Sequence, residues 1–389
     1  MSHRKNIALL AAAQALLLTN GIMLVSINGL LGLQLAADKR LATLPITTYV
    51  IGAALATLPA AFFMKRHGRR AGFMLGAGLG MLGALIAAFA VSIGSFWLLC
   101  LGTVFAGVYN AFGQQYRFAA ADAAPLDWKS KAISLTLTGG IIGGVIGPAV
   151  GKLTRTLLEP TYLASYGALI GFAALSMLIA SRLDIPPLSV AEQKAVGRPW
   201  RRIAGQPAFV VAVLAAACGY GVMNLLMTAT PLAMDICGLP FADTAFILQW
   251  HVIAMFAPSF FTGGLIKRFG VLKILVTGAG LMFVCIGIAL SGVTLMHFWW
   301  ALVLLGVGWN FLFIGGTTLL TETYRPEEKA KVQGSNDFIV LGVQGLTSLS
   351  SGMLVTSEGW ASLNTFALPI VAMTALATTL LWMYRRSSR

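Results

Sequence analysis

Four polar side chains lie inside long apolar stretches of this sequence and could do chemistry there. Asn20, Asn110, Asn310 and His251 each occur among mostly apolar neighbours. A buried amide without a hydrogen-bond partner costs about 1–3 kcal/mol, so each asparagine must bond either to a neighbouring helix or to a bound solute. An imidazole changes its charge near neutral pH, so His251 is either a proton carrier or a neutral hydrogen-bonded side chain. These residues predict solute binding and proton movement within a membrane.

Aromatic side chains accompany the asparagines. Tyr109 precedes Asn110, Trp309 precedes Asn310, and Tyr220 lies 200 residues after Asn20. Aromatic rings offer flat apolar faces that can stack on a planar solute. We therefore expect a solute that is uncharged, zwitterionic, or flat and amphipathic. The predicted substrate-binding residues are Asn20, Tyr109, Asn110, Tyr220, Trp309 and Asn310.

The composition requires a membrane around these side chains. The 389 residues are 58% hydrophobic and 10% charged, with a mean hydropathy of +0.82, whereas a soluble domain carries about 25% charged residues. Apolar runs of about 20 residues can span the hydrocarbon core as helices, which satisfy their own backbone groups. Twelve spans are predicted: 7–31, 45–64, 72–93, 96–120, 132–153, 161–182, 207–231, 242–266, 272–294, 297–321, 334–356 and 363–384.

The basic residues indicate the orientation of the spans. With the N-terminus placed in the cytoplasm, 23 of the 27 Lys and Arg residues fall on the cytoplasmic side. Only Lys39, Arg40, Lys152 and Arg155 fall on the other side. Positive residues remain in the cytoplasm, so we expect an inner (plasma) membrane protein with both termini cytoplasmic. The net charge of +14 lies in short caps between spans, and no nucleic-acid partner is expected.

The two halves of the chain repeat each other at an offset near 200 residues. Gly21 and Met23 match Gly221 and Met223, and the Asn110 and Asn310 positions also correspond. Parallel duplication of a six-helix unit is a known plan of transporters. The repeat predicts an all-α integral membrane protein with twelve transmembrane helices in two pseudo-symmetric six-helix bundles around a central cavity. The predicted domains are 1–182 and 207–389, joined by a polar cytoplasmic linker at 183–206.

Catalytic, metal and cofactor signatures are not found in the sequence. The four cysteines occur singly, without a C-x-x-C pair. No phosphate-binding glycine loop occurs, and no nucleophile can be grouped with a base. We expect no enzyme activity, no cofactor and no metal. The expected partners are a small-molecule substrate, the lipid bilayer and protons, and the protein is expected to act as a monomer.

Two short basic segments follow the second and eighth spans and resemble each other. The first keeps Arg66, Gly68, Arg69 and Arg70 of the pattern G-x-x-x-D-R/K-x-G-R/K-R/K, with Lys65 at the acidic position. The corresponding residues of the second segment are Gly263, Lys267, Arg268 and Gly270.

Another glycine pattern lies in the fifth span. Gly143, Gly147, Pro148 and Gly151 fit G-x-x-x-G-P-x-x-G-G. Small residues four apart permit close approach of helices, so this span is either a static packing surface or a sliding seam.

These loop and fifth-span motifs resemble the major facilitator superfamily over essentially the whole chain. The resemblance implies a secondary transporter that works by alternating access, and the fifth-span motif is associated with antiporters. The expected function is transport of a small organic solute, coupled to protons through His251. There are two alternatives. One is a drug or metabolite efflux antiporter, and the other is a membrane receptor that has the fold but does not transport.

The resemblance also implies a cytoplasmic latch. In the family, the loop aspartate lies against the start of span eleven, where a helix N-terminus carries a partial positive charge. Because Lys65 replaces this aspartate, we predict a charge-swapped latch in which Lys65 or Arg66 faces Asp337. Alternatively, Asp337 only stabilises its own helix start. Arg117, at the end of span four, is expected either to reach the interface as a cap or to bind an anion.

Overall fold

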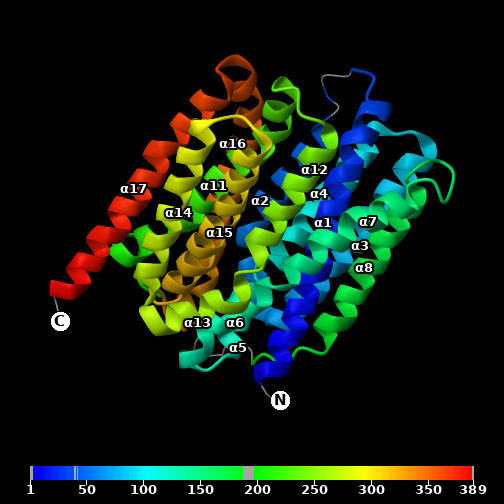
Figure 1. Ribbon diagram of the computed structural model, residues 1–389. Coiled ribbons are helices and arrows are strands. Elements are labelled where there is room, and N and C mark those ends of the chain that lie inside the picture. Colours follow the sequence, from blue (N-terminus) through cyan, green and yellow to red (C-terminus); the bar gives the residue numbers. More distant parts are fainter. Residues whose placement is uncertain (1–2, 39–40, 42, 187–196, 388–389) are drawn as a thin grey trace. The chain divides into compact units, whose positions relative to one another are not determined.

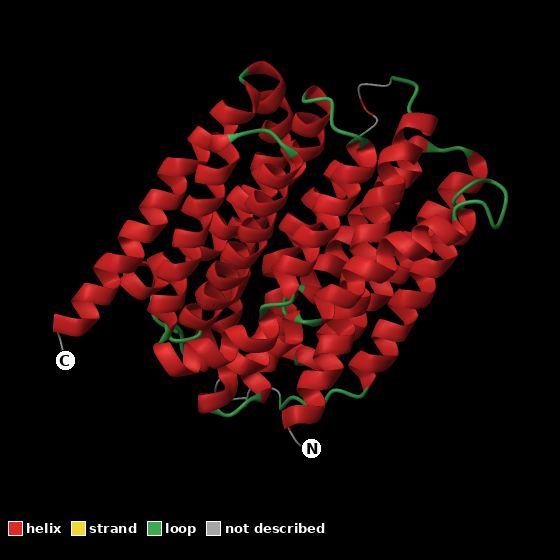
Figure 2. Cartoon of the chain, viewed as in Figure 1, coloured by secondary structure: helices red, strands yellow, loops and turns green. Residues whose placement is uncertain are grey.

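A computed structural model describes residues 3–38, 41, 43–186 and 197–387. All secondary structure of these residues is helical (Figure 2). Within these residues, twelve helical segments are long and apolar enough to cross a membrane, which confirms the all-α membrane fold. Lys39, Arg40 and the centre of the predicted linker lie outside the described residues.

The first six spans are built from eight α-helices, two of which are short. They are α1 (His3–Leu35), α2 (Leu44–His67), α3 (Arg69–Ile93), α4 (Phe96–Gly113), α5 (Tyr116–Ala123), α6 (Lys129–Leu137), α7 (Gly139–Thr154) and α8 (Leu163–Ser181), with the 3₁₀ turn η2 (Leu126–Trp128) before α6.

The second six spans follow the short helix α10 (Trp200–Ala204). They are α11 (Pro207–Ile236), α12 (Phe241–Phe256), α13 (Ser259–Phe269), α14 (Val271–Ser291), α15 (Leu295–Leu320), α16 (Lys329–Ser357) and α17 (Gly359–Ser387), with the 3₁₀ turn η3 (Pro326–Glu328) before α16.

The chain forms two compact units, each containing a short segment from the other half of the sequence. The first unit comprises Met1–Pro125, Leu135–Gly197 and Arg325–Phe338. The second unit comprises Leu126–Ser134, Arg198–Tyr324 and Ile339–Arg389. Helices α6 and α16 are therefore each divided between the units. The predicted domain boundaries, two six-helix bundles at 1–182 and 207–389 with a linker at 183–206, stay a prediction.

Glycines set the packing within the first unit. Helix α1 lies beside α7 and α8 (Figure 1). A Cβ added at Gly139 would overlap the carbonyl oxygen of Ala11 on α1, and one at Gly143 would lie 2.9 Å from the backbone nitrogen of Thr19. The absent side chains allow the two backbones to approach closely. In this unit, the glycines of the fifth-span motif pack against α1.

Helix α15 lies at the centre of the second unit. It packs against α11, α12 and α14, and α17 covers α11 and α14 (Figure 1). Most of its residues from Phe311 to Leu320 are buried. A helix buried on nearly all sides can hold side chains that connect its neighbours.

Two predicted spans are interrupted. Gln114 and Gln115 separate α4 from α5, and Ala257 and Pro258 separate α12 from α13. Pro258 has no N–H, so it cannot donate to the carbonyl of Ala254 as a helix requires. Interruptions of this kind need other hydrogen-bond partners when they lie at membrane depth.

Candidate substrate and proton sites

The side-chain amide of Asn310 forms its hydrogen bonds with residues on both sides of the interruption between α12 and α13. Its Nδ2 donates to the carbonyl of Met255 at 2.7 Å and to Ser259 Oγ at 2.6 Å. Its Oδ1 accepts from Thr262 Oγ1 at 2.7 Å. Asn310 is fully buried, so this amide joins both ends of the interruption to α15.

Ser134 supports the same interruption from α6. Its hydroxyl donates to the carbonyl of Ser259 and accepts from the backbone N–H of Gly263 at 3.0 Å. A Cβ at Gly263 would lie only 2.6 Å from the Cα of Lys131. Glycine is therefore required here for close backbone approach.

Trp309 forms the centre of an aromatic cluster in the second unit. Its ring stacks on Phe313 with centroids 5.2 Å apart, and meets Tyr220 and Phe256 edge to face at 5.3 and 5.4 Å. Trp309, Phe256 and Phe313 are buried, whereas Tyr220 is partly exposed. Tyr220 is thus the member of this cluster with the most accessible ring.

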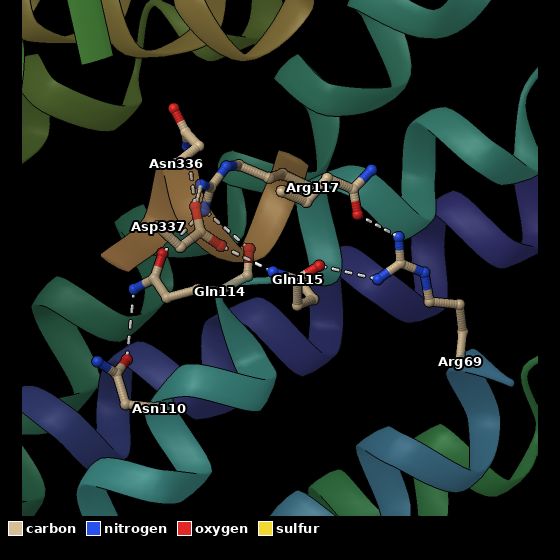
Figure 3. A network of polar contacts seen from close by, with 8 residues as sticks. Arg69, Asn110, Gln114, Gln115, Arg117, Asn336 and Asp337 are labelled. Atoms are coloured by element: carbon tan, nitrogen blue, oxygen red, sulfur yellow. Dashed lines mark hydrogen bonds and ion pairs between the residues drawn. The ribbon is translucent and has the colours of Figure 1, made fainter. Parts of the chain in front are cut away.

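Asn110 differs from its repeat partner Asn310. Asn110 is only half-buried, and its Oδ1 accepts one long hydrogen bond, at 3.4 Å, from Gln114 Nε2 (Figure 3). The preceding Tyr109 is buried, and its ring fills the space beside Gly80. Asn110 therefore has hydrogen-bonding capacity that Asn310 has already used.

Asn20 connects two helices of the first unit. Its Nδ2 donates to the carbonyl of Leu169 on α8 at 3.1 Å, and its side chain is buried. Tyr166 on α8 also donates to Asn28 on α1, at 2.6 Å. The amide of Asn20 thus has a partner on a neighbouring helix.

His251 is fully buried in α12. Its Nδ1 lies 2.7 Å from the carbonyl of Leu302, so Nδ1 carries the proton and donates it. No residue in the described part of the chain hydrogen-bonds its Nε2. This imidazole has one free acceptor nitrogen in apolar surroundings.

The first unit contains a buried ion pair that the sequence did not predict. Arg117 on α5 pairs with Asp337 near the start of α16, and both side chains are 2% exposed. Asp337 also accepts from Gln115 Nε2 at 2.8 Å and from Asn336 Nδ2 at 3.0 Å (Figure 3). A buried carboxylate requires this degree of pairing and hydrogen bonding.

Arg69 continues this network to a second carboxylate. It donates to Gln115 Oε1 at 2.9 Å (Figure 3). It also donates to Gln333 Oε1 at 2.6 Å. It also forms an ion pair with Asp122 at 3.0 Å, and Lys329 reaches the other oxygen of Asp122 at 2.8 Å. The motif arginine therefore connects α3, α5 and the start of α16.

The remaining loop-motif residues lie around this network. Lys65 lines a pocket beside Arg69, whereas Arg66 and Arg70 are exposed. Among the described residues, the hydrogen-bonding and ionic partners of Asp337 are Arg117, Gln115 and Asn336. The pairing of Lys65 or Arg66 with Asp337 stays a prediction.

The glycines of both loop motifs have a backbone role. Gly68 has φ 86° and Gly270 has φ 90°, conformations that favour glycine because it has no Cβ. In the second unit, Lys267 pairs with Asp127 at 2.9 Å, and the guanidinium of Arg268 lies over the Phe269 ring.

Comparisons with known proteins identify the fold and the relatives. Residues 9–343 match the sequence profile of the Major Facilitator Superfamily. The chain is 43% identical over 376 residues to the riboflavin transporter RfnT of Brucella anthropi, covering 95% of this chain and 94% of that protein. It is 29% identical over 387 residues to the uncharacterized MFS-type transporter YddS of Bacillus subtilis, covering 93% and 87%.

Solved structures of transporters share the same fold. The MFS transporter FucP in its outward conformation has a TM-score of 0.77 at 17% identity, covering 96% of this chain and 98% of that one. The human organic anion transporter MFSD10 has a TM-score of 0.80 at 12% identity, covering 97% and 100%.

Proposed function

Because the chain belongs to the major facilitator superfamily and is a multi-pass secondary transporter of a small organic solute, we propose that this solute is riboflavin. The proposal depends above all on the 43% identity to a riboflavin transporter along nearly the whole of both chains. A non-transporting receptor and a drug or metabolite efflux antiporter are not favoured by these relatives.

The chemistry of riboflavin suits the residues available in each unit. Its isoalloxazine ring is flat and uncharged, with polar atoms at its edge, and its ribityl chain carries hydroxyl groups. The partly exposed ring of Tyr220, supported by Trp309, offers a surface for stacking. The half-buried amide of Asn110 has donors for a carbonyl or hydroxyl oxygen. We assign Tyr220 and Asn110 as contacts of the solute.

The other predicted site residues have packing roles in this proposal. Trp309 and Tyr109 are buried, and Asn310 and Asn20 bond to neighbouring helices. We propose that they shape the binding surface without direct hydrogen bonds to the solute.

Orientation and coupling belong to the same proposal. The positive residues support an inner-membrane protein with both termini in the cytoplasm. We propose that it works as a monomer without enzyme activity and that transport is driven by protons. Coupling through His251, and a latch between Lys65 or Arg66 and Asp337, stay predictions.

A binding measurement on the purified protein tests the proposed solute. Riboflavin fluorescence is quenched when its ring stacks on a tyrosine or tryptophan, and a ligand that binds the folded state raises the melting temperature. We expect riboflavin to show saturable quenching and stabilisation, and lumiflavin, which has the ring without the ribityl chain, to compete. Ribitol alone should not compete. If riboflavin causes neither quenching nor stabilisation, the proposal is contradicted.

A further inference from the structure

The ion pair between Arg117 and Asp337 lies within two membrane-spanning segments, where charged residues are rare. We propose that the Asp337 carboxylate is the proton-binding site that couples transport to a proton gradient, and that Arg117 is its switching partner. This inference rests on the proposed proton-driven transport of riboflavin and adds the residue that binds the proton.

Only one member of the pair can exchange a proton. An arginine side chain stays charged in proteins, so proton binding must occur at Asp337. One O–H bond forms at the carboxylate, which becomes a neutral carboxylic acid. No electron or other group is transferred. Protonation thereby removes the negative charge that holds Arg117.

Arg117 has other acceptors when Asp337 is neutral. Its Nη1 donates to the carbonyl oxygen of Gln114 at 2.8 Å and to Gln114 Oε1 at 3.0 Å. These bonds keep the guanidinium partly satisfied without the carboxylate. An arginine with no such acceptors would strongly resist loss of its counter-ion.

Burial disfavours the ionised form of Asp337, and the charges around it favour that form while the pair is closed. Arg117 faces it from α5, and Arg69 acts on it from α3. On α16 itself, Lys329 is paired with Asp122, and the neutral Asn336 bonds to Asp337. Among these groups, Arg117 forms the direct ion pair. Separating Arg117 from Asp337 therefore allows the carboxylate to bind a proton.

A hydrogen-bonded path connects Asp337 to a pocket. The pocket has a volume of about 120 Å³ and is lined by Lys65, Arg69, Asp122, Lys329 and Gln333, among others. This volume is large enough to hold water. Arg69, at its wall, donates to Gln115, and Gln115 donates to Asp337. A guanidinium has no acceptor and an amide does not relay protons, so the proton reaches Asp337 from water of this pocket when Arg117 and Asp337 separate.

The position of Asp337 along α16 suits a switch. Asp337 lies two residues before Ile339, where α16 passes from the first unit into the second. A change in how α16 binds the first unit would act on this ion pair directly. His251, by comparison, hydrogen-bonds to the backbone carbonyl of Leu302.

The first test separates solute exchange from proton-driven accumulation in proteoliposomes. Asp337→Asn alone would leave Arg117 buried without its counter-ion, so the test variant is Arg117→Gln with Asp337→Asn, which removes both charges. We expect this variant to exchange internal for external riboflavin and to lose accumulation driven by a pH gradient. Glu322→Gln, which removes the carboxylate of the exposed pair with Arg385, should accumulate riboflavin as the parent does. Parental accumulation by the double variant would overturn the proposal.

The second test is made without riboflavin. It does not depend on whether the double variant folds. Infrared difference spectra of the parent protein, recorded between alkaline and acidic pH, should contain the C=O band of a newly protonated buried carboxyl group. Asp337→Glu should shift this band, and Glu322→Gln should leave it unchanged. A band unaffected by Asp337→Glu would overturn the proton site. If the parent binds no riboflavin but the band shifts, the solute assignment fails and the proton site stands.

Discussion

Asn310 donates a 2.7 Å hydrogen bond to the carbonyl of Met255 across the interruption that Pro258 creates between α12 and α13. Its repeat equivalent, Asn110, accepts a long bond of 3.4 Å from Gln114. The same side chain therefore supports a broken helix in one unit and is available to a solute in the other.

Replacing Asn310 by alanine should destabilise the protein. Thr262, Ser259 and the Met255 carbonyl would all lose their bonds to the amide. Each buried group left unsatisfied costs about 1–3 kcal/mol. We expect a clearly lower melting temperature in detergent for Asn310→Ala than for the matched variant Asn110→Ala. Equal melting temperatures would show that the interruption does not depend on this amide.

Replacing Asn110 by alanine should weaken riboflavin binding without affecting folding. Loss of one hydrogen bond to the solute costs about 1 kcal/mol, or roughly a fivefold increase in Kd. Fluorescence titration measures Kd, and the melting temperature without ligand checks folding. An unchanged Kd would show that Asn110 does not bond to the solute and has only a packing role.

The ring of Tyr220 should contribute to flavin binding. An aromatic contact is worth about 0.5–1.5 kcal/mol beyond its buried area, so Tyr220→Leu should raise Kd roughly two- to tenfold. Tyr220→Phe keeps the ring and serves as the matched control. If both variants bind riboflavin as the parent does, stacking on Tyr220 makes no contribution.

The membrane fold could be predicted from the sequence because composition and charge act locally. Each apolar run of about 20 residues predicts one membrane-spanning helix by itself. The basic loops occur at matching places in the two halves and indicate the repeat. The interruption at Pro258 was not predicted, because the apolar run continues through it and its hydrogen-bond partners come from α15 and α6.

The buried ion pair was missed for a different reason. Arg117 and Asp337 are 220 residues apart, and each alone looks like a charge near the end of a span. One signal was present: Arg117 and Asp337 each fall inside a predicted span, 96–120 and 334–356, where charged residues are rare and face protein or water. Two such charges of opposite sign can pair with each other.

His251→Gln distinguishes the two candidate proton sites. The Asp337 proposal predicts that this variant still accumulates riboflavin in response to a pH gradient, because the ion pair with Arg117 is intact. Accumulation and exchange are measured in the same proteoliposomes. Loss of accumulation with exchange retained would instead support His251 as the proton carrier.

Reporter fusions test the orientation. Fusions after Arg70 and at Arg389 should report the cytoplasm, because basic residues concentrate in these segments. A fusion near Asp243 should report the opposite side. A cytoplasmic signal at Asp243 would overturn the predicted topology.

Transport of riboflavin by the purified protein in liposomes tests the central claim most directly. With a proton gradient imposed, proteoliposomes should concentrate radiolabelled riboflavin above the external level, and unlabelled riboflavin should compete while ribitol should not. Addition of a protonophore should reduce the internal concentration to the external one. The account would be contradicted if the reconstituted protein is folded and riboflavin still enters the proteoliposomes no faster than it enters protein-free liposomes.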